Sequence, residues 1–148
     1  MRILKYFMSF IFLIVVAACS TLTLKPADYS WPIENALKVD AKGFIEEQRY
    51  AFTLKVKPLF FEEFADSNNC SGKEIRIIRD KLGYVYITGK DFKNVYIFMV
   101  IEGGMKAENK VLVAEKGLAS PAFNQKTPNI ELIDGSEKFI LNHKGVVR

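Results

Sequence analysis

The sequence predicts an all-β protein with one antiparallel domain of about eight strands, a β-sandwich or an up-and-down barrel, preceded by an N-terminal signal helix. Residues 50–57 alternate between apolar and polar side chains, which is typical of a strand with one buried face. Tight-turn residues recur between apolar segments, and residues 95–101 form an unbroken apolar run. Short strands at this spacing fit either a sandwich or a barrel, and the sequence does not separate the two.

The domain is predicted to begin with a strand at residues 34–39. A type I turn follows at 40–43, which starts with Asp and ends with Gly and is expected to close a hairpin. The alternating strand at 50–57 comes next. Pro58 suits the first turn of a helix, so we favour one or two helical turns over residues 58–65, with a continued strand as the alternative.

The middle of the chain is predicted to contain further strands, from its turn residues and from an apolar run. The turn pattern recurs at 80–83, between strands at 74–79 and 84–88. The apolar run at 95–101 predicts a central strand that is covered on both faces. Gly103-Gly104 then supplies the positive φ angles of a tight hairpin.

The C-terminal part is expected to complete the sheets. The return strand of the glycine hairpin covers about 105–114, and residues 115–128 are expected to be irregular because they contain Gly117, Pro121 and Pro128. Asp134-Gly135 between apolar segments predicts a last hairpin over 129–141.

Residues 1–18 are typical of a secretory signal peptide. Arg2 and Lys5 precede thirteen residues, 6–18, that are apolar apart from Ser9. A membrane-spanning helix needs about 20 apolar residues, with a lower limit near 17. The run is therefore too short for a transmembrane anchor, and it ends in small residues instead of a basic cluster.

The segment Val16-Ala17-Ala18-Cys19 resembles the lipobox of bacterial lipoproteins. The resemblance implies cleavage between Ala18 and Cys19, acylation of the Cys19 thiol and, often, acylation of the new amino group. An ordinary secretory cleavage is the alternative, because residues 16–18 also fit a small-x-small site. A cysteine immediately after the cleavage point favours the lipid, and each buried methylene then contributes about 0.8 kcal/mol to membrane binding.

The same resemblance implies a location. An Asp after the lipidated cysteine commonly signals retention at the inner membrane, whereas this chain has Ser20. We therefore expect an outer-membrane protein that faces the periplasm. The resulting division is a signal peptide at 1–18, a lipidated tether at 19–30 and an antiparallel β domain at 31–148.

Size and charge narrow the possible partners. The mature chain has 130 residues (148 minus 18), enough for one domain, and a net charge of +2 (19 basic minus 17 acidic). So small a charge predicts no nucleic-acid partner.

Cys70 is the remaining thiol, within the polar segment 66–72. We favour an incidental residue there over a reactive exposed thiol.

The sequence contains no recognisable catalytic or metal-binding motif, and no cofactor is implied. His143 is the single histidine and lies near the C-terminus, where a fraying surface position is the favoured interpretation. Neighbouring acids at 46–47 and 62–63 do not converge on a strand or helix, so solvated charge is favoured. An enzyme would have its acids around Glu62, Glu63 and Asp66, and this is the weakest hypothesis.

Aromatic side chains are the best candidates for a partner surface. Trp31 lies between tether and domain, Tyr84 and Tyr86 share one strand face, and Tyr96 and Phe98 share another. For Trp31 we favour docking on its own domain over a partner role, and core positions are the alternative for the other four.

These observations lead to three functional hypotheses. The first is a lipid-anchored, non-catalytic binding or assembly module of the cell envelope, attached to the membrane through Cys19 and binding another envelope protein. The alternative is a carrier or sensor of a small apolar ligand inside a β-barrel. The third is an enzyme.

Overall fold

The computed structural model of the protein describes residues 28–147. The predicted signal peptide, Ala18, Cys19 and most of the tether lie outside these residues. The described chain is antiparallel and mostly β, as predicted, and its sheets are open and stacked as in a sandwich, not closed into a barrel. It contains eleven strands instead of about eight, and one helix.

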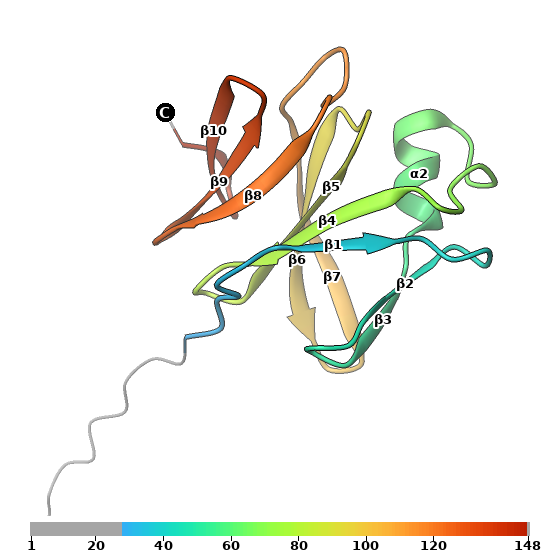
Figure 1. Ribbon diagram of the computed structural model, residues 1–148. Helices are drawn as coiled ribbons and strands as arrows, with labels where there is room; N and C mark the ends of the chain where they lie inside the picture. Colours follow the sequence, from blue (N-terminus) through green and yellow to red (C-terminus); the bar gives the residue numbers. More distant parts are fainter. Residues whose placement is uncertain (1–27, 148) are drawn as a thin grey trace, which may run out of the picture.

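A five-stranded sheet forms the centre of the molecule, in the order β1-β4-β5-β6-β7 (Figure 1). Its strands are β1 Asn35–Lys38, β4 Glu74–Arg79, β5 Tyr84–Gly89, β6 Asn94–Ile101 and β7 Gly104–Leu112. A four-stranded sheet, in the order β11-β10-β9-β8, contains β8 Pro121–Lys126, β9 Asn129–Asp134, β10 Glu137–Asn142 and β11 Gly145–Val146. The remaining elements are the hairpin β2 Phe44–Glu47 and β3 Phe52–Lys55, and the helix α2 Lys57–Phe64.

The central sheet is covered on both faces, so the molecule has two cores. On one face lie α2 and the β2–β3 hairpin, where Phe60 and Ile45 pack with Ile77. On the other face lies the four-stranded sheet, where Phe123 packs with Ile78. Because neighbouring residues on a strand point to opposite faces, Ile77 and Ile78 contribute one to each core.

The predicted hairpin after residues 34–39 is wrong in its pairing, although its turn is present. The Asp40 carboxylate accepts hydrogen bonds from the backbone N–H groups of Lys42 and Phe44, both at 2.8 Å. However, β1 pairs with β4 in the register Asn35↔Ile77, and β2 pairs with β3. The turn therefore carries the chain from the edge of one sheet to another sheet.

The structure differs from the sequence prediction in three other segments. Residues 115–128, expected to be irregular, contain β8, which pairs with β9 in a tight hairpin that turns between Lys126 and Asn129. His143, expected in a fraying tail, stacks on Tyr84 with ring centroids 4.5 Å apart, next to β11. The apolar run of β6 is covered on both faces only in its first half, because its last three residues extend beyond the sandwich and are exposed.

Candidate functional site

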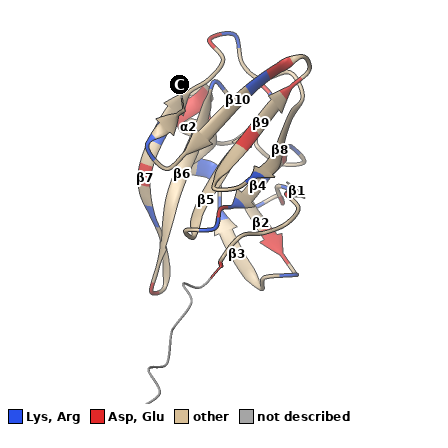
Figure 2. Ribbon diagram, turned by 90° about the vertical axis from the view of Figure 1, so that its left-hand side faces the viewer, with Lys and Arg blue, Asp and Glu red and all other residues tan. Residues whose placement is uncertain are grey.

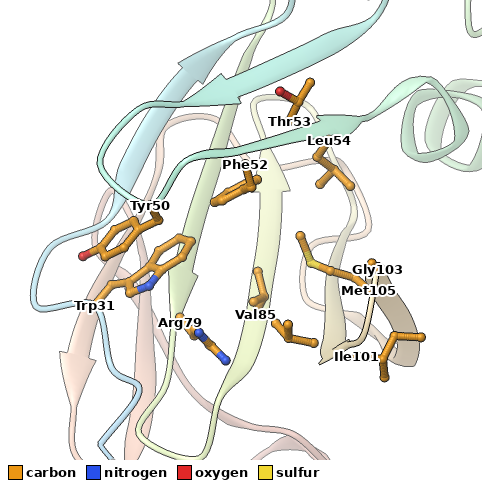
Figure 3. A pocket seen from close by; sticks show the side chains of 12 residues that line it. Trp31, Tyr50, Phe52, Thr53, Leu54, Arg79, Val85, Ile101, Gly103 and Met105 are labelled. Atoms are coloured by element: carbon orange, nitrogen blue, oxygen red, sulfur yellow. The ribbon is translucent and has the colours of Figure 1, made fainter.

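The described chain contains an apolar groove of about 460 Å³. It lies between the β2–β3 hairpin and the tip of the β6–β7 hairpin, over the ends of β4 and β5 (Figure 3). Ligand sites usually measure about 300–1,000 Å³ and are mostly apolar. The groove is lined by Trp31, Tyr50, Phe52, Thr53, Leu54, Arg79, Val85, Val100, Ile101, Gly103, Gly104 and Met105.

Trp31 forms one wall of the groove and is held there by its backbone. Its N–H donates to the carbonyl of Arg79 at 3.0 Å, and its carbonyl accepts from Gln125 Nε2 at 2.9 Å. Its ring stacks on Tyr50 at 4.2 Å, with the planes 4° apart, and on Phe52 at 5.8 Å. This wall is therefore preorganised, with Trp31 only 5% exposed.

The base and the opposite wall of the groove are aliphatic. Val85 is fully buried beneath it, and Leu54 and Met105 are partly buried and pack against the same core. Val100 and Ile101, at the tip of the β6–β7 hairpin, are 43% and 46% exposed. They offer apolar surface to any molecule that enters the groove.

Arg79 is the single charged side chain among the lining residues. Its Nε donates to the carbonyl of Gly83 at 3.1 Å, and its guanidinium carbon lies 5.0 Å from the centre of the Tyr29 ring. No carboxylate among residues 28–147 forms an ion pair with it. The groove thus combines an apolar trough with one cation at its edge.

Of the aromatic residues predicted to form a partner surface, Trp31 lines this groove, and the two tyrosines of β5 do not. Tyr86 is fully buried, and its hydroxyl donates to the buried Asp80 carboxylate at 2.9 Å. Burial, and secondly the Asp80 charge, raise the pKa of the Tyr86 phenol. Tyr84 is half-buried under His143, so this pair of tyrosines packs between the two main sheets.

The β6 pair faces the opposite side of the central sheet. Tyr96 is 6% exposed, and its hydroxyl donates to Glu63 at 2.8 Å. Burial, followed by this hydrogen bond, raises the pKa of the Tyr96 phenol. Phe98 is half-buried and packs against the same core. The four tyrosine and phenylalanine residues therefore do not form one exposed surface.

The acids named for the enzyme hypothesis have structural partners. Glu63 accepts hydrogen bonds from the backbone N–H groups of Lys93 and Asn94, from the Asn94 amide and from Tyr96. The expectation of solvated charge is therefore wrong for Glu63. It is also wrong for Glu47, which is 3% exposed and pairs with Arg49 at 3.2 Å. Glu62 forms an exposed ion pair with Lys110 at 2.9 Å. Within residues 28–147 no group of three His, Cys, Asp or Glu side chains is placed to hold a metal ion.

Cys70 is free and only 2% exposed. Its side chain is therefore buried, although the surrounding residues 66–72 are mostly polar. A buried thiol packed in an apolar core is protected from solvent oxidants.

Most of the residues that line the groove, Arg79 included, were not predicted from the sequence. A signal for Arg79 was nevertheless present: it continues the alternation of Ile75 and Ile77, the buried face of β4. A basic residue at a position where the alternation predicts an apolar one indicates either the end of the strand or a polar group within an apolar site.

Comparison of the chain with protein-family models, curated proteins and solved structures gives no match. Among the described residues, no helix has both the length and the apolar character needed to cross a bilayer. Function therefore has to be inferred from the groove and from the N-terminal sequence.

Proposed function

We propose that the protein is a lipid-anchored, non-catalytic binding module of the bacterial cell envelope that holds an apolar guest in its groove. Lipid on Cys19 would keep it at the periplasmic face of the outer membrane. The observation that carries the proposal is the position of the groove. The groove is lined by Trp31, which lies near the start of the described chain, and by the tip of the β6–β7 hairpin. Figures 1 and 2 show that the described chain begins at the same end of the domain as this tip.

The entry of the chain is fixed next to the groove. The Tyr29 N–H donates to the carbonyl of Lys81 at 3.3 Å, two residues before Trp31. Asp28 lies nine positions after Cys19, so the tether spans roughly 30 Å at most. A tether of this length keeps the start of the domain near the lipid surface and allows an orientation in which the groove faces that surface.

Exposed apolar side chains at the same end support that orientation. Tyr29 is 49% exposed, Leu82 in the β4–β5 turn is 63% exposed, and Ile101 at the β6–β7 tip is 46% exposed. Aromatic and aliphatic side chains beside cationic ones are typical of protein surfaces that lie at a membrane interface.

A second candidate function is the docking of another envelope protein on the β6–β7 hairpin. Met99, Val100 and Ile101 are all at least 37% exposed at its protruding end. Such a row of apolar side chains favours a protein contact, and the experiment that follows distinguishes this partner from a small guest.

Photocrosslinking in intact cells tests the proposed function. A photoreactive residue replaces Leu54, whose partly exposed side chain points into the groove (Figure 3), and a control replaces Glu137, which is exposed on β10 of the four-stranded sheet. We expect a reproducible adduct from position 54 and none from position 137. A small added mass indicates a small guest, and a protein-sized adduct indicates the second candidate function. Absence of any adduct at position 54, or the same adducts at both positions, would contradict a binding role for the groove.

A further inference from the structure

We infer that the guest of the groove is a long-chain fatty acid, with its carboxylate at Arg79 and its alkyl chain along the apolar trough. This inference rests on the proposed function, because it names the chemical class of the guest. Two features of the structure carry it: the cation at the edge, and the shape and lining of the trough. The nearness of a lipid surface comes from the proposed function.

The guanidinium of Arg79 supports an anionic head group. Only its Nε is used by a hydrogen bond in the described chain, and no described carboxylate neutralises its charge. The side chain is half-buried, so an unpaired charge there is less well solvated than on an open surface. A guanidinium binds a carboxylate with two parallel hydrogen bonds, which matches its two remaining nitrogen atoms.

The lining of the trough supports a hydrocarbon chain. From Arg79 the groove passes over Val85 and between Phe52 and Leu54 on one side and Met105 on the other (Figure 3). None of these four side chains offers a strong hydrogen-bonding group, so a polar ligand would lose hydration without compensation. Methionine and leucine adapt to a flexible chain, and each methylene that is buried contributes about 0.8 kcal/mol.

The size of the groove favours one chain over two. A volume of about 460 Å³ lies in the lower part of the usual range for ligand sites. A diacyl phospholipid, with two chains and a bulky head group, needs more enclosed space. The tether keeps the groove near a bilayer, which is the natural reservoir of amphiphiles with a single chain.

Trp31 makes the inference directly measurable, because it is the one tryptophan of the chain and lies in the groove wall. The lipidated full chain is reconstituted in phosphatidylcholine vesicles, and stearate brominated at mid-chain is added. Bromine quenches tryptophan fluorescence on contact, so we expect saturable quenching of Trp31. Phosphatidylcholine that carries the same brominated chain, at an equal proportion of chains, is expected to quench far less.

Matched variants test the role of the cation. Arg79→Gln is expected to raise the stearate concentration for half-quenching about tenfold or more, as loss of a charge-assisted hydrogen bond predicts. Lys81→Gln removes the same charge from the exposed β4–β5 turn at the same end of the molecule, and we expect it to leave the quenching unchanged. Thermal unfolding of both variants checks that they fold.

Three results would overturn the inference. These are no quenching of the unmodified protein by brominated stearate, equal quenching by stearate and phospholipid, or equal effects of the two variants. Equal quenching would mean that the groove dips into the bilayer and holds no free fatty acid. If stearate fails while position 54 still gives an adduct of small mass in cells, the fatty acid is wrong and the proposed binding function stands.

Discussion

Replacing Phe60 by alanine is expected to lower the free energy of unfolding by about 3–5 kcal/mol. Phe60 is 1% exposed and lies in the core between α2 and the central sheet. Its ring meets Phe92 edge-on at 5.2 Å and Phe64 at 6.0 Å. Truncation removes a large buried apolar surface and leaves a cavity that the surrounding aromatic rings fill only in part. Denaturant-induced unfolding followed by far-UV circular dichroism measures the loss.

The neighbouring residue provides the control. Phe61 is on the same helix and is 59% exposed, so Phe61→Ala removes the same atoms with nearly the same change in helix propensity. We expect a change within about 0.5 kcal/mol, as for most surface substitutions. Similar losses for the two variants would show that α2 is not packed with Phe60 inward.

Glu63→Ala is expected to cost about 3 kcal/mol, the second-largest effect. The Glu63 carboxylate is the common acceptor for the start of β6 and the Tyr96 hydroxyl, with donor distances of 2.7 to 3.2 Å. Hydrogen bonds to charged groups contribute about 1.5–3 kcal/mol, and the donors left behind keep their desolvation cost. The substitution therefore disconnects α2 from β6, and the same unfolding measurement detects it.

Glu62→Ala serves as its control, since it removes the same groups from the adjacent position. The ion pair of Glu62 with Lys110 is solvent-exposed on both sides, and exposed pairs contribute about 0–1 kcal/mol. The difference between the variants separates a structural carboxylate from a solvated one. A stability unchanged by Glu63→Ala would contradict the structural role assigned here.

Local chemistry predicted much of the fold correctly. Asp80 and Gly83 define a turn that is present, with the Asp80 carboxylate accepting the Tyr84 N–H at 2.9 Å. The flanking strands β4 and β5 match their predicted ranges closely, because the turn residues and the apolar residues lie within one continuous segment. The helix at 57–64 follows for the same reason, with Pro58 in its first turn.

Two of the features that the sequence did not predict depend on contacts between distant residues. Pairing of β1 with β4 joins residues about 40 positions apart, for example Asn35 with Ile77, and no local pattern specifies such a partner. The groove has the same character, since Trp31, Leu54, Arg79 and Met105 come from four separate segments. The sequence shows which of these side chains are apolar, but local sequence patterns do not show that the four side chains meet in space.

The proposed membrane location depends most directly on lipidation of Cys19. The proposed source of the guest depends on it as well. The decisive measurement is the intact mass of the natural protein extracted from membranes with detergent. We expect a polypeptide that begins at Cys19 and carries the additional mass of acyl chains, and a Cys19→Ser chain that lacks this mass and leaves the membrane fraction. A natural protein that begins at another residue, or that begins at Cys19 with an unmodified thiol, would contradict the anchor.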